Sequence, residues 1–170
     1  MRSDHIPLRS TDERSGRTGW IAPVSVMLGS MLTLLPFVAT FPFLPPLGLL
    51  MLLGWRLTRF DALKVWAPVP LGLFDDMFSG QPMGSAMLFW SLCFIIIDVL
   101  DTRLVWRDFW QDWLIAAGAV AFCLIGGRLV ATPFTAHVDT ALLLQIIVCA
   151  ALFPIVSSFC GWLNRSAKRG

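Results

Sequence analysis

The chain has 170 residues, of which 56% are hydrophobic and only 14% are charged. Soluble domains average about 45–50% apolar and about 25% charged residues, so this composition excludes an ordinary water-soluble globule and indicates a membrane protein. The net charge of +2 gives no reason to expect a nucleic-acid partner, and the length fits one compact unit.

Residues 1–19 are polar and contain four arginines. We expect a disordered cytoplasmic tail here, because the segment has too few apolar residues to pack. A signal peptide is disfavoured, since no small-residue cleavage site closes the apolar run that follows. Trp20 therefore begins a membrane span that the protein keeps.

Six apolar runs follow in chain order, and they differ in length. A helix needs about 20 residues to cross the hydrocarbon of a bilayer. Four runs have or approach that length: Trp20–Ala39, Gly84–Leu100, Trp113–Val130 and Ala141–Leu163. Two runs, Leu44–Trp55 and Val65–Phe78, are short and broken by proline. We expect these two inside the bundle, as a hairpin that crosses only part of the way, where neighbouring helices cover their freed backbone groups.

The basic residues and tryptophans predict the orientation. Lys and Arg concentrate on the cytoplasmic side of short loops, and Trp prefers the headgroup level. With six spans and a cytoplasmic N-terminus, every Lys and Arg except Arg128 falls on a cytoplasmic segment, and every Trp except Trp90 lies at a cytoplasmic helix end. We predict an all-α, polytopic membrane bundle of about six transmembrane helices over residues 20–163. A basic cytoplasmic tail, residues 164–170, follows it.

An acidic pair, Asp75–Asp76, ends the second short run. Acidic residues at membrane depth cost roughly 2.5–3.5 kcal/mol each, so they are normally functional or paired. Four residues here are spaced by four: Gly72, Asp76, Gly80 and Gly84. Pro82 is expected to end the helix before the last of them and to make a tight turn. Three interpretations stay open: Asp76 locks helix ends together or binds a partner, the pair is wetted by water at the outer interface, or it binds a ligand or ion.

Two further acidic residues, Asp98 and Asp101, lie in the last turn of the fourth of the six runs, Gly84–Leu100, near the predicted inner surface. We expect them at the interface, paired with Arg103 or Arg107. The segment Thr102–Trp113 that follows has Trp at i, i+4 and i+7, which predicts a short helix lying along the headgroups. It serves as an anchor or as a docking surface for a cytoplasmic partner. The candidate docking residues are Arg103, Trp106, Arg107 and Trp110.

Catalytic and metal-binding patterns are missing from the sequence. It contains no HExxH, GxSxG, P-loop or GxGxxG motif. The only histidines are His5 and His137, and the four cysteines lie in apolar runs without metal-ligand spacing. We therefore expect no enzyme activity, no cofactor and no metal site.

The stretch Pro42–Arg103 resembles the rod shape-determining protein MreD family. The resemblance is carried by the run from Pro45 to Leu50 and by the run from Gly72 to Gly84. The family pattern has Gly-Leu, two further residues, an Asp, and then Gly-x-Pro-x-Gly before the next span. Four residues are in register with Asp76 as the family Asp: Gly72, Gly80, Pro82 and Gly84. The charged tail before Trp20 is longer than in many members.

The resemblance implies a non-catalytic inner-membrane component of the bacterial cell-elongation machinery. Its implied partners are MreC-like and MreB-like proteins and the peptidoglycan synthases of lateral wall growth, besides membrane lipids. The alternative is a small-molecule-binding membrane subunit, similar to the substrate-capture components of vitamin importers. Such a site needs aromatic and polar residues at the outer face, whereas the predicted orientation puts nearly all the tryptophans at the inner side.

Overall fold

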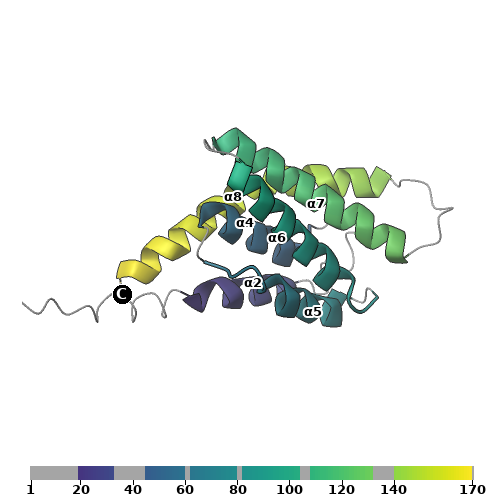
Figure 1. Cartoon of the computed structure of the whole chain (residues 1–170), viewed down its shortest axis with the longest axis horizontal. Coiled ribbons are helices and arrows are strands. Elements are labelled where there is room, and N and C mark those ends of the chain that lie inside the picture. The colour runs from purple at the N-terminus through teal and green to yellow at the C-terminus, as the bar shows by residue number, and fades with distance from the viewer. Residues whose placement is uncertain are drawn as a thin grey trace, which may run out of the picture.

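The computed structural model describes residues 19–32, 45–59, 62–79, 82–103, 108–131 and 140–169. Within these ranges the chain is all-helical, with six helices and no strand (Figure 1). The helices are α2 (Ile21–Met31), α4 (Leu47–Thr58), α5 (Pro68–Ser79), α6 (Ser85–Arg103), α7 (Phe109–Ala131) and α8 (Thr140–Arg169). The predicted all-α class is confirmed for the described residues.

Three helices, α6, α7 and α8, are long and apolar enough to cross a membrane. The helices α2 and α4 are apolar but shorter, with 11 and 12 residues. The first predicted span, Trp20–Ala39, is described only as far as Leu32, and residues 33–44 lie outside the described part of the chain. Three of the described helices could thus span a membrane, and the count of six spans stays a prediction.

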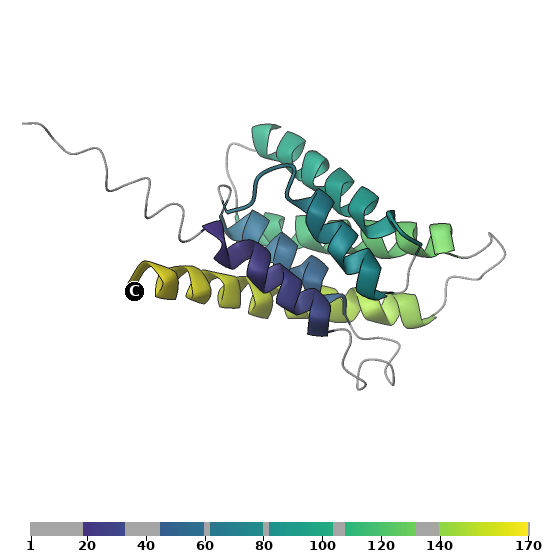
Figure 2. The ribbon, with the colours of Figure 1, turned by 90° about the horizontal axis from the view of Figure 1, so that it is seen from below.

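The short helix α4 lies at the centre of the bundle. Nine of its 12 residues are buried, and it packs between α2 on one side and α8 on the other (Figure 1). In the view from below, α2 lies in front of α4 (Figure 2). Its sequence suits this place, because leucines and glycines occupy most of the helix until Arg56. A Cβ on Gly54 would lie 3.1 Å from the Sγ atom of Cys160, so α8 approaches α4 closely at this glycine. The expectation that this run lies inside the bundle is confirmed.

The second short helix, α5, is peripheral rather than central. Only four of its 12 residues are buried, and it packs against α6 and α2 instead of pairing with α4 as a hairpin. The helix carries polar residues at its end and an exposed face with Leu73 and Met77. A helix with so few buried residues lies at the edge of the bundle, because a central helix is covered on all sides.

Trp55 is a core residue and not a ring at the headgroup level, so the prediction for this tryptophan was wrong. Its side chain is fully buried. Its Nε1–H donates to the Oγ atom of Ser25 over 2.7 Å, and the Ser25 hydroxyl donates in turn to the carbonyl of Ala22 over 2.8 Å. The indole turns inward because α2 supplies an acceptor for its only polar group.

Helix α8 contains Pro154 in its interior and bends along its length (Figure 1). Proline lacks the N–H that would donate to the carbonyl four residues earlier, here that of Ala150. The indole Nε1–H of Trp113 in α7 donates to this carbonyl over 2.8 Å. The neighbouring helix thereby supplies the donor that proline removes, as a membrane interior demands.

This contact predicts a coupling between Trp113 and Pro154. Trp113→Phe removes the donor and leaves the Ala150 carbonyl unsatisfied, so the free energy of unfolding should fall by about 1–3 kcal/mol. In a Pro154→Ala background the introduced alanine has an N–H that can donate to that carbonyl, and Trp113→Phe should cost clearly less. Denaturation of the detergent-solubilised protein and its three variants measures the cycle. If Trp113→Phe lowered the free energy of unfolding equally in both backgrounds, the indole of Trp113 would not be compensating for the N–H that Pro154 lacks.

Candidate functional site

The acidic pair at the end of α5 contacts two different sets of neighbours. Asp75 shares a side-chain hydrogen bond with Ser30 in α2, and its Oδ1 atom lies 3.2 Å from where a Cβ on Gly48 would stand. Asp76 points instead at the start of α6. The two carboxylates therefore tie α5 to α2 and to α6 within one turn, and Asp75 also lies close to α4 at Gly48.

The Asp76 carboxylate accepts four hydrogen bonds from the chain that enters α6. Its Oδ1 atom accepts from the N–H of Ala86 over 2.9 Å and from the hydroxyl of Ser85 over 3.1 Å. Its Oδ2 atom accepts from the N–H of Gly84 over 2.9 Å and from that of Met87 over 3.3 Å. The side chain is only 3% exposed, so these donors replace the water that a carboxylate at the surface would bind.

This arrangement is an N-cap supplied by another helix. The first N–H groups of a helix have no intrahelical acceptor, and the helix dipole favours a negative charge beside them. Asp76 meets both needs of α6 from a position eight to eleven residues earlier in the chain. A buried carboxylate normally needs a cation or several donors, and here backbone donors provide the compensation.

Two glycines make this geometry sterically feasible. A Cβ on Gly72 would lie 2.6 Å from Met87 Cα, so any larger residue would force α5 and α6 apart. Gly84 has a φ of +95°, in the left-handed region that favours glycine. Of the predicted site residues, the structure thus brings together Gly72, Asp76 and Gly84.

The remaining residues of the motif lie in the connection between the helices. Helix α5 ends at Ser79, ahead of Pro82 as expected, and the N–H of Ser85 donates to the Pro82 carbonyl over 3.1 Å, which closes a turn. Gly80 lies outside the described residues. Ser85 was not among the predicted site residues, although a serine directly after Gly84 is a recognisable start of a helix.

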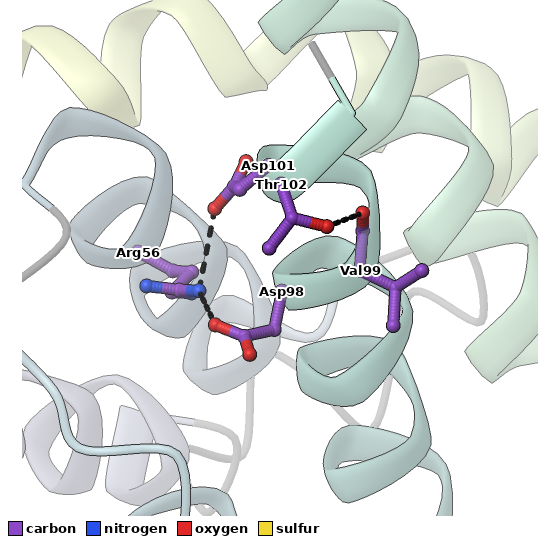
Figure 3. A network of polar contacts seen from close by, with 5 residues as sticks. All are labelled: Arg56, Asp98, Val99, Asp101 and Thr102. Atoms are coloured by element: carbon purple, nitrogen blue, oxygen red, sulfur yellow. Dashed lines mark hydrogen bonds and ion pairs between the residues drawn. The ribbon is translucent and has the colours of Figure 1, made fainter.

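A second polar cluster joins the ends of α4 and α6 (Figure 3). Arg56 is 5% exposed, and its Nη2 atom lies 2.7 Å from Asp98 Oδ1 and 3.3 Å from Asp101 Oδ2. Its guanidinium carbon also lies 5.7 Å from the centre of the Phe94 ring. Arg56 is therefore an ion-pair partner of both acids, whereas the partners expected from the sequence were Arg103 and Arg107; Arg107 lies outside the described residues.

Residues 104–107 of the predicted interfacial helix over Thr102–Trp113 lie outside the described residues, and the described residues on either side belong to α6 and α7. Thr102 and Arg103 are the last residues of α6, and Trp110 and Trp113 lie in the first turns of α7. Trp110 is 71% exposed, and its ring meets that of Trp113 edge to face at 6.0 Å. Of the candidate docking residues, Arg103 and Trp110 lie at the same end of the bundle, and Trp106 lies outside the described residues.

The chemistry that these two clusters offer is structural. Every oxygen of the Asp76 carboxylate is engaged with α6, which opposes its use as a base or nucleophile. Within the described residues, no group of three or more His, Cys, Asp or Glu side chains is arranged to hold a metal. Cys93 and Cys123 lie with their Sγ atoms 3.4 Å apart between α6 and α7, both buried.

Comparisons with protein-family models, with curated proteins and with solved structures give no significant match for this chain.

The cap predicts unequal costs for substitutions at neighbouring positions of α5. Asp76→Ala removes the acceptor of three backbone N–H groups and one hydroxyl, so it should lower the free energy of unfolding by about 2–4 kcal/mol. Met77→Ala, on the exposed face of the same turn, should change it by less than about 0.5 kcal/mol. Denaturation in detergent measures both, and amide hydrogen exchange at Gly84, Ala86 and Met87 should accelerate only in the Asp76 variant. Unchanged exchange at these amides would contradict the cap.

Proposed function

We propose that this chain is a non-catalytic scaffold of the bacterial cell-elongation machinery, of the MreD kind, in the inner membrane. The observation that carries the proposal is the Asp76 cap. The residues that carry the resemblance, Gly72, Asp76 and Gly84, are those that hold α5 against α6. A motif whose residues serve one helix–helix junction fits a protein whose task is to keep a fixed shape for its partners.

The predicted orientation is supported by how the helix ends group. The C-terminal ends of α4 and α6 meet through Arg56, Asp98 and Asp101. The guanidinium of Arg59 donates to Asn164 Oδ1 over 2.8 Å, which joins the end of α4 to the last part of α8. These ends share one side of the bundle, as an alternating path through six helices requires. We assign this side, with both chain termini, to the cytoplasm, because it carries most of the basic residues.

The scaffold offers two kinds of surface to partners. The exposed end of the bundle with Arg103 and Trp110 suits MreB-like or other cytoplasmic partners. The exposed apolar faces of α6, α7 and α8 suit the membrane helices of MreC-like proteins and wall synthases. The glycines at 48, 54 and 126 do not serve this purpose, because their open sides face residues of the same chain: Ser30, Cys160 and Phe89.

The proposal is tested by cell shape. Asp76→Ala in the native gene should convert rods into round or swollen cells, because the junction between α5 and α6 loosens. Met77→Ala should leave rods, since this neighbouring side chain is exposed and outside the cap. Microscopy with immunoblotting of membranes gives the result at matched protein levels. Normal rods with Asp76→Ala at normal abundance would count against the proposal.

A vitamin-capture subunit is the second candidate, and one hollow favours it. A space of about 540 Å³ lies between α2, α4 and α8, within the range of about 300–1,000 Å³ that small-molecule pockets occupy. Its lining is almost wholly apolar, with residues such as Trp20, Leu28, Met51 and Phe159, whereas a vitamin needs several convergent polar groups.

Thermal denaturation of the purified protein with a panel of vitamins separates the two candidates. A specific binder gains stability from its ligand by mass action, by about 2.7 kcal/mol at a hundredfold excess over Kd. We expect no vitamin to raise the midpoint. A saturable rise with one vitamin would favour the capture subunit over the scaffold.

A further inference from the structure

A polar pocket lies at the end of the bundle that carries the basic residues. It has a volume of about 430 Å³ and is bounded by the end of α4, the start of α7 and the second half of α8. Its lining residues are Leu57, Thr58, Phe109, Asp112, Phe153, Ser157, Ser158, Gly161 and Arg165. Neither the Asp76 cap nor the Arg56 cluster contributes to it.

The guanidinium of Arg165 reaches into this pocket. A Cβ on Gly161 would lie 3.8 Å from Arg165 Nη1 and 4.0 Å from Thr58 Cγ2. The arginine therefore folds back by one turn of α8 and lies near the last residue of α4. The missing side chain at Gly161 leaves room beside the guanidinium. Arginine presents five donors in a planar fork, which matches the oxygens of a phosphate.

Hydroxyl groups surround the same space. Ser157 and Ser158 line the pocket, and each hydroxyl donates to the Pro154 carbonyl, over 3.0 and 2.8 Å. A hydroxyl hydrogen rotates freely, so each serine can donate to a phosphate oxygen instead. Thr58 adds a third hydroxyl from α4.

The α7 wall of the pocket carries a negative charge, Asp112. A carboxylate has about four lone-pair sites, so it can accept from an ammonium group beside the contacts that it already has. One guanidinium and one carboxylate in the same pocket are complementary to a ligand with one phosphate and one ammonium. A purely anionic ligand would meet the repulsion of Asp112.

The position of the pocket relative to the bilayer indicates a membrane lipid as its ligand. Exposed aromatic side chains lie at this end of the bundle, namely Phe109, Trp110 and Trp162, and such rings mark the headgroup level of a bilayer. Leu57 and Phe153 add apolar walls, which suit the glycerol part of a phospholipid. Basic pockets between membrane helices on the cytoplasmic side are known to bind lipid headgroups, and Arg165 supplies the basic group here.

We propose that this pocket binds the phosphoethanolamine headgroup of a membrane phospholipid. Arg165 and the hydroxyls of Thr58, Ser157 and Ser158 hold the phosphate, and Asp112 accepts from the ammonium. The lipid then joins α4, α7 and α8 at the membrane surface. This inference needs a membrane-embedded bundle but not the role in cell elongation.

The test compares headgroups on the purified, delipidated full chain. Native mass spectrometry with short-chain phosphatidylethanolamine, phosphatidylglycerol and phosphatidylcholine should give the strongest binding for the first, since only its ammonium can donate N–H to Asp112. Arg165→Gln removes a charge-assisted contact and should weaken phosphatidylethanolamine binding about tenfold. Asp112→Asn should abolish the preference over phosphatidylglycerol.

Two further variants control for folding and for charge. Gly161→Leu fills the pocket without changing any charge and should also weaken phosphatidylethanolamine binding. Arg128→Gln removes an arginine at the other end of α7 and should leave it unchanged. Circular dichroism and gel filtration verify that each variant is folded.

Three results would overturn the inference. The first is equal binding of phosphatidylethanolamine and phosphatidylglycerol by the unsubstituted protein. The second is unchanged binding by both Arg165→Gln and Gly161→Leu. The third is competition by free phosphoethanolamine as effective as that by the lipid, which would assign the pocket to a soluble phosphate compound.

Discussion

Unpaired backbone groups are the constraint on which this structure depends. Inside a bilayer no water is available to bond a free N–H or C=O, so each one needs a partner from the protein. The chain meets this need with single polar side chains placed at the weak points of its helices. Asp76 accepts from the start of α6, and Trp113 donates to the carbonyl that Pro154 frees in α8.

These contacts also determine how the helices are arranged. Each side chain belongs to one helix and the group it satisfies to another, so the hydrogen bond and the packing of the two helices form together. Trp55 and Ser25 join α4 to α2 in the same way, and Arg56 joins α4 to α6. A few polar side chains in an apolar chain thus specify which helices are neighbours, where the apolar surfaces alone would allow many arrangements.

Composition and hydropathy sufficed to predict the helical class. The shortness and the prolines of the run around Leu49 and Leu50 predicted its central place, and Pro82 predicted the end of α5. Each of these follows from local properties of the chain. The partner of Asp98 did not follow, because Arg56 lies 42 positions away, and nearer arginines satisfied the same argument. Asp98 and Asp101 are three residues apart on one face of α6, which indicates a shared partner but not its identity.

The inward position of Trp55 likewise could not be predicted from the sequence. An indole at the end of an apolar run looks the same whether it faces lipid or a neighbouring helix, and only the presence of Ser25 in α2 decides between them. For Asp76, the spacing to Gly84 suggested a junction of helix ends, which the hydrogen bonds now describe atom by atom. The peripheral place of α5 was missed because proline content predicts a need for cover but not which helices supply it.

The enclosure of α4 bears on how the protein is made. Twelve residues of helix span about 18 Å, less than the hydrocarbon thickness, so α4 has little tendency to stay in a bilayer by itself. Its cover comes partly from α8, and contacting residues such as Met51 and Cys160 are 109 positions apart. While the ribosome is still synthesising the intervening chain, α4 lacks the contacts that α8 later provides. Insertion of this helix is therefore completed late, and a translocon or chaperone that shelters it until α8 emerges would protect the nascent chain from misassembly.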